Sequence, residues 1–349
     1  MRIAQVCTVF EPVPPPRYGG VERVVGILTD QLVDDGHDVT LYASGDSLTK
    51  AELKAACPVS LRQAVDQKFP DLTVAVYMKM MADIVDDLDR YDVVHFHTGF
   101  YHLPTFRQYR HKCLTTAHLP VTTEPPIGPV LAKFSELPLI AISVDQRSHY
   151  PGLNWQGVIH HGIPSNLYTG DMQGGEYLLF VGRIAPSKRP DRAIEIARAA
   201  GLKLKIAAKI DDLFRDYFAE AVEPHIDGDQ VEFLGEVSDS DKQTLYGGAK
   251  ALLFPIDWNE PFGLVMVEAM ACGTPVIAWD QGSVAEIVSD GLTGFRVHSV
   301  AEAVAAVPRV GELSRAAIRT EFERRFTSER MAQRYVEEYE GLLAQATPR

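Results

Sequence analysis

The chain has 349 residues, a formal net charge of −13, and hydrophobic and charged fractions of 46% and 23%. These values are typical of a soluble globular protein of about two domains, and the acidic balance disfavours a nucleic-acid-binding protein, which usually carries a basic face. No apolar run approaches the ~20 residues that cross a bilayer, and four cysteines without paired or metal-like spacing favour a reducing, cytoplasmic compartment.

Short apolar runs alternate with helix-like stretches along the whole chain. The expected strands cover residues 3–9, 38–42, 93–97, 113–116 and 139–142 in the first half, and 177–181, 204–208, 231–234, 251–254 and 274–278 in the second. Helices are expected between them, for example over residues 21–35 and 190–200. Nearly continuous apolar runs are typical of parallel strands that helices cover on both faces. The pattern predicts an α/β fold of two Rossmann-like, doubly wound domains.

A stretch rich in Gly, Pro and polar residues at 158–175 separates the two halves. We therefore expect an N-terminal domain over residues 1–165 and a C-terminal domain over residues 171–330. The stretch from about 312 to 346 has apolar residues at helical spacing and is expected to be helical and amphipathic.

Two carboxylates bracket a Phe-Gly turn in the last third of the chain. Glu260 precedes Pro261-Phe262-Gly263, and Glu268 follows on a helix expected to open near Gly263–Leu264. The free N–H groups of a first helical turn can receive an anion such as a diphosphate. Glu268 lies about one turn further in, within reach of a ribose, and Glu260 can face hydroxyls at the other end of the ligand. This arrangement favours a sugar nucleotide over an ordinary surface helix.

Two further segments could contact the same ligand. Gly182-Arg183 and Lys188 follow an expected strand, and their two cations could neutralise a diphosphate leaving group. Gly19-Gly20 opens the helix at 21–35 and could present backbone N–H groups, although a plain tight turn explains a glycine pair equally well.

Histidines follow two strands of the first half. His118 ends the strand at 113–116 and is expected to face the cleft between the two domains. His95 and His97 share one face of a strand, but without a third ligand at suitable spacing a metal site is disfavoured. The basic stretch at 107–112 could bind an anionic acceptor or a membrane surface, and a solvated helix face is the simpler interpretation.

The segment at 260–271 resembles the Glu-x7-Glu signature of the retaining glycosyltransferases of family four, which have the GT-B fold. The resemblance runs from the Gly-Gly loop to about Val297 and is tightest over residues 254–297. It implies two Rossmann-like domains facing a cleft, the second binding a nucleotide sugar, with a last helix at about 331–349 packing back on the first. One departure is Arg189, since the family usually has Gly after the lysine.

The resemblance also implies a set of site residues. Catalytic roles fall to Arg183, Lys188, Glu260 and His118. Donor-binding roles fall to loop, strand-end and helix-start positions: Gly19, Gly20, Gly182, Ile210, Gly235, Val237, Phe262, Gly263, Leu264, Val265 and Glu268. In the implied mechanism the loosening sugar–phosphate bond is stabilised without a metal, the acceptor attacks from the same face, and a donor phosphate oxygen takes its proton.

The implied partners are a nucleotide sugar, with UDP as the first choice of nucleotide and GDP as the second, and a hydroxyl acceptor; no cofactor is expected. Two other functions compete. A sugar-nucleotide epimerase of the same fold needs acid–base carboxylates at the sugar, and the Arg-x4-Lys with Glu-x7-Glu combination disfavours it. A catalytically inactive nucleotide-sugar-binding subunit is disfavoured because Arg183, Lys188 and Glu260 are all present.

Overall fold

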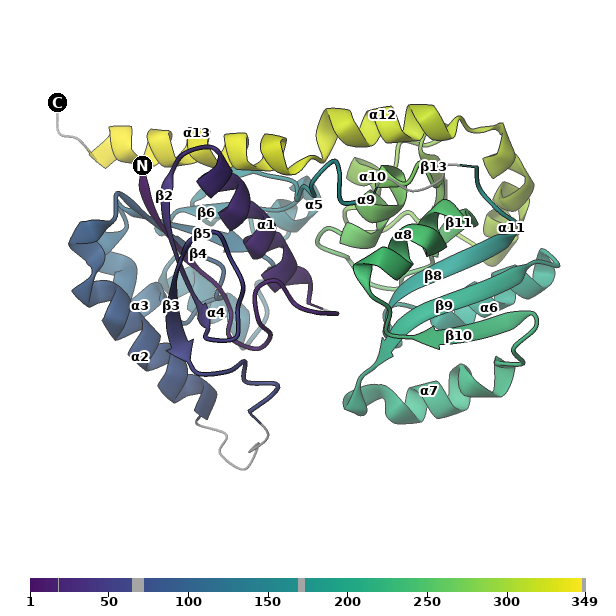
Figure 1. The fold of residues 1–349 in the computed structure, drawn as a ribbon, viewed down its shortest axis with the longest axis horizontal. Helices are drawn as coiled ribbons and strands as arrows, with labels where there is room; N and C mark the ends of the chain where they lie inside the picture. The colour runs from purple at the N-terminus through teal and green to yellow at the C-terminus, as the bar shows by residue number, and fades with distance from the viewer. Residues whose placement is uncertain (18, 65–71, 169–172, 347–349) are drawn as a thin grey trace. The chain divides into compact units, whose positions relative to one another are not determined.

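The computed structural model describes residues 1–17, 19–64, 72–168 and 173–346. The chain forms two compact units (Figure 1). The first contains Met1–Gly162 together with Ser328–Arg349, and the second contains Ile163–Thr327. Residue 171, at which the second domain is expected to begin, and residues 347–349 of the expected last helix lie outside the described residues.

The first unit is built on a parallel sheet of seven strands in the order β3-β2-β1-β4-β5-β6-β7. Its strands are β1 (Arg2–Val6), β2 (Asp38–Ser44), β3 (Glu52–Cys57), β4 (Val93–Phe96), β5 (Cys113–Ala117), β6 (Leu139–Ala141) and β7 (Trp155–Val158). Helices α1 (Gly20–Asp34), α2 (Leu72–Asp86), α3 (Leu103–Phe106), α4 (Ile127–Lys133) and α5 (Val144–Ser148) connect them. The strand order is that of a Rossmann-like doubly wound sheet.

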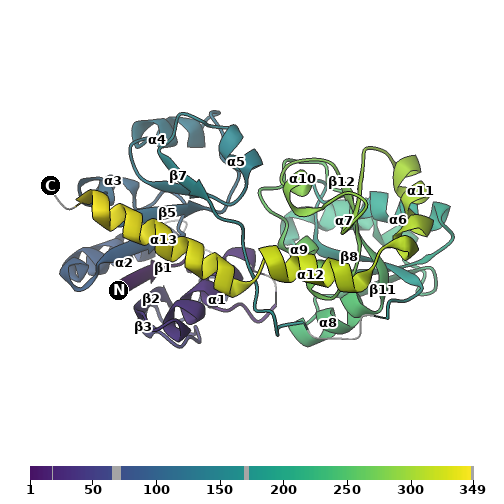
Figure 2. The same cartoon turned by 90° about the horizontal axis from the view of Figure 1, so that it is seen from above.

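The last helix of the chain, α13 (Ser328–Ala346), belongs to the first unit. Figure 2 shows it lying across the sheet, and it packs beside α1. Its buried side chains recur at spacings of three or four residues and form one apolar stripe: Met331, Ala332, Tyr335, Tyr339 and Leu342. The sheet face that this stripe covers would otherwise be open to water.

The second unit repeats the architecture with six parallel strands in the order β10-β9-β8-β11-β12-β13. Its strands are β8 (Tyr177–Ile184), β9 (Lys203–Ile210), β10 (Val231–Gly235), β11 (Ala249–Phe254), β12 (Val276–Trp279) and β13 (Gly294–Val297). Its helices are α6 (Pro190–Ala199), α7 (Arg215–Ala221), α8 (Asp239–Gly247), α9 (Leu264–Ala271), α10 (Val284–Ile287), α11 (Val300–Arg309) and α12 (Arg315–Arg325). The expected doubly wound α/β fold of two Rossmann-like domains is confirmed.

Three strands were not expected from the sequence: β3, β7 and β13. Each lies at an edge of its sheet, and β3 and β7 are mostly half-buried or exposed. An edge strand needs less apolar surface than a central one, so the apolar-run signal fails there.

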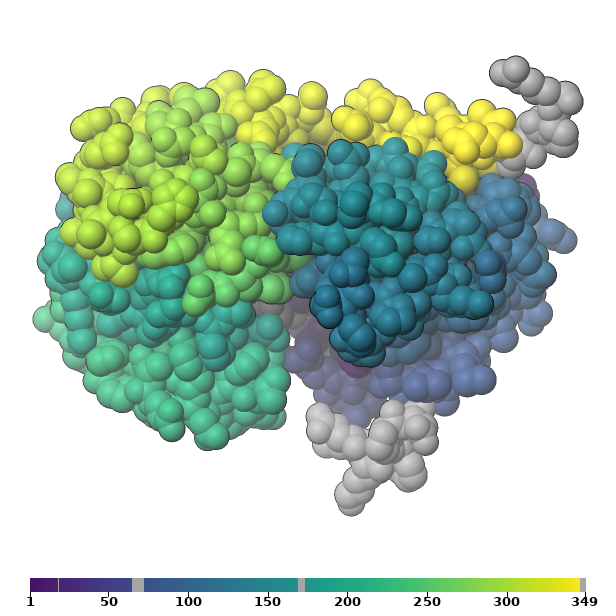
Figure 3. Space-filling model, turned by 180° about the vertical axis from the view of Figure 1, so that it is seen from behind, coloured from purple at the N-terminus to yellow at the C-terminus, as the bar shows by residue number. Residues whose placement is uncertain are grey.

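The helical stretch expected from 312 to 346 is two helices, because the chain passes from the second unit to the first at Thr327–Ser328. Phe326 and Thr327, which separate α12 from α13, are both buried. Figure 3 shows the α4–β7 segment (blue to teal) on the surface of the first unit, with α13 (yellow) beside it. No helix in the described ranges is both long and apolar enough to span a membrane.

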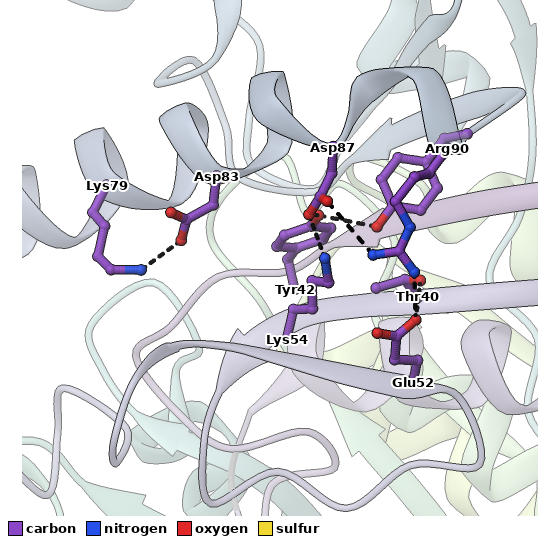
Figure 4. A network of polar contacts seen from close by, with 9 residues as sticks. Thr40, Tyr42, Glu52, Lys54, Lys79, Asp83, Asp87 and Arg90 are labelled. Carbon is purple, nitrogen blue, oxygen red and sulfur yellow. Dashed lines mark hydrogen bonds and ion pairs between the residues drawn. The ribbon is translucent and has the colours of Figure 1, made fainter.

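A polar network joins the end of α2 to two strands of the first unit (Figure 4). The Asp87 carboxylate accepts a hydrogen bond from the Tyr42 hydroxyl at 2.8 Å and forms an ion pair with Lys54. Arg90 lies 3.5 Å from Asp87 and 3.0 Å from Glu52. The hydrogen bonds from Lys54 and Tyr42 hold the pKa of Asp87 below its ordinary value.

Candidate functional site

The second unit gathers polar loops at one edge of its sheet, because all six strands are parallel and their carboxyl ends therefore meet at the same edge. The strand order reverses between β8 and β11. In open α/β sheets, ligands bind at such a switch point, outside the carboxyl ends of the strands. Lys188 follows β8 and Glu260 follows β11, so these two expected catalytic residues flank the switch point.

Lys188 and Glu260 form an ion pair in this structure, with Lys188 Nζ against Glu260 Oε2. Trp258 Nε1 donates to the same oxygen at 3.0 Å, and Lys188 Nζ lies 4.8 Å from the centre of the Trp258 ring. The lysine and glutamate side chains are only 16% and 12% exposed. Within the described residues Glu260 Oε1 has no hydrogen-bond donor, so it is available to a ligand hydroxyl.

The loop that carries Glu260 is held by the turn after β12. Ser283 donates its backbone N–H to the Glu260 carbonyl at 3.0 Å and its hydroxyl to the Phe262 carbonyl at 2.7 Å. Gly282 has φ 62°, and a Cβ there would lie 2.5 Å from the Glu260 backbone nitrogen. The turn can approach this closely only because residue 282 is glycine.

The amino-terminal end of α9 presents backbone donors beside Glu260. Gly263 precedes the helix with φ 81° and provides no side-chain cap. The hydrogen bonds of the described residues include none for the N–H groups of Leu264 and Val265, and both residues are half-buried. Two unpaired donors at a helix amino terminus form an anion-binding position.

Glu268 lies on the second turn of α9 and is 2% exposed. Its carboxylate accepts from the Tyr246 hydroxyl at 2.8 Å and lies 3.5 Å from Lys242 Nζ, both residues of α8. A ribose hydroxyl would have to share this carboxylate with α8. The expected ribose contact stays a prediction.

Arg183, near the end of β8 next to Gly182, reaches across to the neighbouring strand end. Its guanidinium lies 3.4 Å from Asp211 Oδ2 and 5.4 Å from the centre of the Phe214 ring. Arg183 Nε is buried and has no partner among the described residues. A buried donor without an acceptor is unfavourable, so this nitrogen is left unsatisfied in the present conformation.

The remaining donor-binding candidates of this unit occupy different environments. Ile210 ends β9, Gly235 ends β10 with φ 69°, and Val237 lies in the loop before α8, so all three are at the carboxyl edge. Phe262 is 2% exposed and packs near Phe326, so its side chain belongs to the core rather than to a ligand surface.

Arg189, the departure from the family pattern, has a left-handed backbone with φ 55° and ψ 51°. Its guanidinium pairs with Asp191 at 2.9 Å and with Asp257 at 3.1 Å. Asp257 N–H in turn donates to the Ser187 carbonyl at 2.8 Å. The ion pair of Arg189 with Asp257 therefore connects the loop that contains Lys188 with the loop that leads to Glu260.

In the first unit, Gly19 precedes α1 and Gly20 is its first residue. A Cβ on Gly19 would lie 2.8 Å from Pro15 Cβ, so the loop passes too close for any side chain. Glu22 of the first helical turn is buried and accepts from the Thr8 hydroxyl at 2.5 Å.

Four histidines lie at the carboxyl ends of β4 and β5. His97 Nδ1 lies 2.7 Å from His118 Nε2, His95 Nε2 lies 2.8 Å from Thr116 Oγ1, and His102 Nε2 lies 2.7 Å from Thr115 Oγ1. Burial lowers the pKa of His118 and of His102 to about 3, and it also lowers the pKa of His95 and His97 well below the ordinary value. All four rings are therefore neutral near pH 7. The described residues contain no group of three or more His, Cys, Asp or Glu that could hold a metal ion.

Sequence reasoning missed four residues that contact the candidate side chains: Asp211, Lys242, Tyr246 and Trp258. Trp258 lies two residues before Glu260 and could have been noticed as an aromatic donor close to a carboxylate. The other three lie on α8 or in the loop after β9, and their contacts arise from packing that one sequence does not show.

Comparison with known proteins agrees with this fold. Residues 18–143 match the family model described as Glycosyltransferase Family 4, and residues 170–319 match Glycosyl transferases group 1. A phosphatidyl-myo-inositol mannosyltransferase of Propionibacterium freudenreichii is 30% identical over 349 aligned positions, which cover 88% of this chain and 86% of that protein. A D-inositol 3-phosphate glycosyltransferase of Mycobacterium tuberculosis is 34% identical over 193 residues, or 46% of this chain and 39% of that protein. The crystal structure of AviGT4, a glycosyltransferase involved in avilamycin A biosynthesis, matches with a TM-score of 0.73 at 25% identity, over 98% of both chains.

Proposed function

Because this chain belongs to the GT-B glycosyltransferases, we propose that it transfers a hexosyl unit from a nucleoside diphosphate sugar to a hydroxyl acceptor, with retention of anomeric configuration and without a metal. The observation that carries the proposal is the Lys188–Glu260 pair at the switch point of the second sheet, beside the unpaired N–H groups of Leu264 and Val265. Lys188 can neutralise a diphosphate, and Glu260 can bind sugar hydroxyls.

The leaving group governs the chemistry. As the sugar–phosphate bond lengthens, negative charge develops on the diphosphate, and Lys188, Arg183 and the two α9 amides offer four preorganised sources of positive potential. Removing one such donor typically costs about 3 kcal/mol of transition-state stabilisation. This set of donors supports departure of the diphosphate without help from a metal ion.

Retention is proposed because Glu260 is poorly suited to be a nucleophile or a base. Its Oε2 atom is already paired with Lys188 and accepts a hydrogen bond from Trp258, so that oxygen is occupied. The acceptor would then attack from the face of the departing diphosphate, and a phosphate oxygen would take its proton. His118, neutral at pH 7, would contact the donor sugar.

For the substrates, UDP is the first choice of nucleotide and GDP the second. The relative that covers most of this chain is named for mannosyl transfer to phosphatidyl-myo-inositol, so mannose and an inositol-bearing acceptor are the first sugar and the first acceptor to test. An inositol ring offers the hydroxyl nucleophile that the reaction requires.

The test is release of free nucleoside diphosphate from UDP-, GDP- and ADP-sugars in the presence of EDTA, with and without inositol and phosphatidylinositol. One donor is expected to turn over, faster with an acceptor, and the anomeric configuration of the product is read by NMR. Glu260→Ala is expected to lose at least about 100-fold in kcat, whereas Glu220→Ala, an exposed carboxylate on α7, keeps full activity.

Each contrary result has a distinct meaning. Nucleotide binding without turnover of any donor under any condition would favour an inactive binding subunit, and conversion of the donor to its epimer would favour the epimerase. Activity abolished by EDTA and restored by a divalent cation would overturn metal independence. An inverted product would overturn the proposed stereochemistry alone.

A further inference from the structure

A continuous chain of buried hydrogen bonds runs from the C-terminal helix to His118 within the first unit. Tyr339 on α13 accepts from Gln5 Nε2 at 3.0 Å, Gln5 Oε1 lies 2.8 Å from His97 Nε2, and His97 Nδ1 lies 2.7 Å from His118 Nε2. Tyr339, Gln5 and His97 are each no more than 2% exposed. We propose that Tyr339 is a positioning residue that selects the tautomer of His118 through Gln5 and His97.

The proton positions follow from donor and acceptor chemistry. Gln5 Oε1 can only accept, so His97 must carry its proton on Nε2. A neutral His97 then has a lone pair on Nδ1, which can only accept from His118, so His118 carries its proton on Nε2. The remaining nitrogen of His118, Nδ1, is left with a lone pair.

The direction of this chain depends on which way the Gln5 amide points. An amide can rotate by half a turn and exchange its NH2 and carbonyl groups. Tyr339 prevents this because its own hydroxyl proton is directed at His95 Nδ1, 2.7 Å away, which leaves the hydroxyl oxygen as an acceptor for Gln5. This requires His95 Nε2 to donate to Thr116 Oγ1, 2.8 Å away, which Thr116 allows by directing its own proton at the Tyr335 hydroxyl, 2.9 Å away.

The outcome matters for recognition of the sugar. His118 is half-buried, and no described residue bonds to its Nδ1. With the lone pair fixed on that atom, His118 accepts a hydrogen bond from a hydroxyl and cannot donate one to an ether or carbonyl oxygen. This role in recognition rests on the proposed function, in which His118 contacts the donor sugar. The assignment of the tautomer does not rest on the proposed function.

Tyr339→Phe removes the hydroxyl and keeps the ring. Gln5 can then rotate and donate to His97, which would move its proton to Nδ1 and donate to His118 Nε2, and His118 would become protonated on Nδ1. Tyr42→Phe is the matched control: the same change at an equally buried tyrosine of the first unit, whose hydroxyl contacts Asp87 and Tyr91 rather than Gln5 or a histidine.

The experiment records ring 15N NMR shifts of histidine-labelled full-length protein near pH 7, with His118→Asn to assign the signal. Wild type and Tyr42→Phe are expected to show His118 protonated on Nε2 only, and Tyr339→Phe to show a substantial fraction protonated on Nδ1. With the donor found by the panel above, Tyr339→Phe is expected to lower kcat/KM by about tenfold, and Tyr42→Phe by less than about twofold.

Wild-type His118 protonated on Nδ1 would overturn the proposal, and this NMR measurement depends on no tyrosine variant and no enzymatic turnover. An unchanged tautomer in a folded Tyr339→Phe protein would overturn the role of Tyr339. Failure of every donor to react would count against the proposed function while leaving the NMR result to decide the tautomer. A shifted tautomer with unchanged kcat/KM would overturn the recognition role of His118 Nδ1.

Discussion

Arg189 keeps a backbone conformation that normally favours glycine, and its side chain joins two loops of the candidate site. The left-handed region costs a residue with a Cβ about 1 kcal/mol. Arg189→Ala should lose the ion pairs and keep that cost, whereas Arg189→Gly should lose the ion pairs and relieve it. We therefore expect Arg189→Gly to be more stable than Arg189→Ala by about 1 kcal/mol in urea unfolding.

The same pair of variants tests whether the ion pairs hold the site together. Activity should fall similarly in both, because both leave Asp257 with only its longer ion pair to Arg192 at 3.7 Å and so loosen the loop that leads to Glu260. Equal stabilities would show that the backbone strain is not realised, and full activity in the glycine variant would show that the guanidinium is dispensable.

His102 makes the protein sensitive to acid. It is buried at 1% exposure, stacks on Phe96 and has its pKa lowered by burial from 6.5 to about 3. Between these two values the unfolded chain binds a proton that the folded chain does not, so stability falls as the pH decreases from 6.5. The contribution of one such histidine is at most about 1.4 kcal/mol per pH unit.

His102→Gln should therefore flatten the acid limb of the stability curve. Between pH 6.5 and 4.5, wild type is expected to lose about 2 kcal/mol more than the variant, measured by urea unfolding at each pH. The buried His95 and His97 act in the same direction and remain in both proteins. Parallel curves would mean that His102 is already protonated in the folded state.

Single residues of the site differ in how far the sequence could predict them. The sequence could predict Lys188 and Glu260 as site residues because each follows an apolar strand, and the carboxyl ends of parallel strands meet at one edge. It could also predict the position of Glu268 on the helix. The contacts of Glu268 with Tyr246 and Lys242, however, arise from the packing of α8 against α9. Spacing along the chain carries no information on such a contact.

At the scale of elements, the network around Asp87 fastens the end of α2 to β2 and β3 (Figure 4). Asp87→Asn should cost about 1–2 kcal/mol at pH 7, since it leaves Lys54 and Tyr42 without their charged partner. Because the folded-state pKa of Asp87 is lowered, its contribution is present above the unfolded pKa and is lost as the pH falls through the folded value.

Asp83→Asn is the control for this prediction. Asp83 lies one turn earlier on α2, and its one ion pair among the described residues is an i,i+4 contact with the exposed Lys79, which should be worth less than about 0.5 kcal/mol. Urea unfolding compares the two variants. Equal effects would show that the Asp87 network is an ordinary surface ion pair.

Most elements were predictable, and the exceptions share one cause. Central strands such as β4 and β11 are buried on both faces and leave an apolar run in the sequence. The edge strand β3 has only one strand neighbour, and its residues are mixed in polarity. The break between α12 and α13 was hidden for another reason, because both segments are helical and only the change of unit separates them. The expected amphipathic pattern holds for α13, whereas α12 is mostly polar and buries Ile318 and Phe322.

At the scale of the whole molecule, the two units differ in how the chain builds them. Residues 163–327 form the second unit without interruption, and they contain Arg183, Lys188, Glu260 and the start of α9. We expect this fragment to fold alone and to bind the same nucleoside diphosphate as the full chain, within about tenfold in Kd by calorimetry. The fragment 1–162, which lacks α13, should remain unfolded or aggregate, as judged by circular dichroism and light scattering.

A fragment 163–327 that folds but does not bind the nucleotide would assign part of the binding energy to the first unit. A soluble, cooperatively folded 1–162 would show that α13 is an accessory element. Adding a synthetic peptide of residues 328–346 to 1–162 distinguishes a missing helix from a general folding defect.

The place of α13 in the first unit also has a consequence for biosynthesis. A ribosome delivers β1 to β7 before the second unit, and the helix that covers their sheet only after the second unit is complete. Gln5, His95 and Thr116 therefore meet their tyrosine partners only after the whole second unit has been synthesised. The second unit can therefore complete its core before the first unit does. Until α13 is made, the sheet of the first unit stays uncovered and is the surface most open to chaperones and to aggregation.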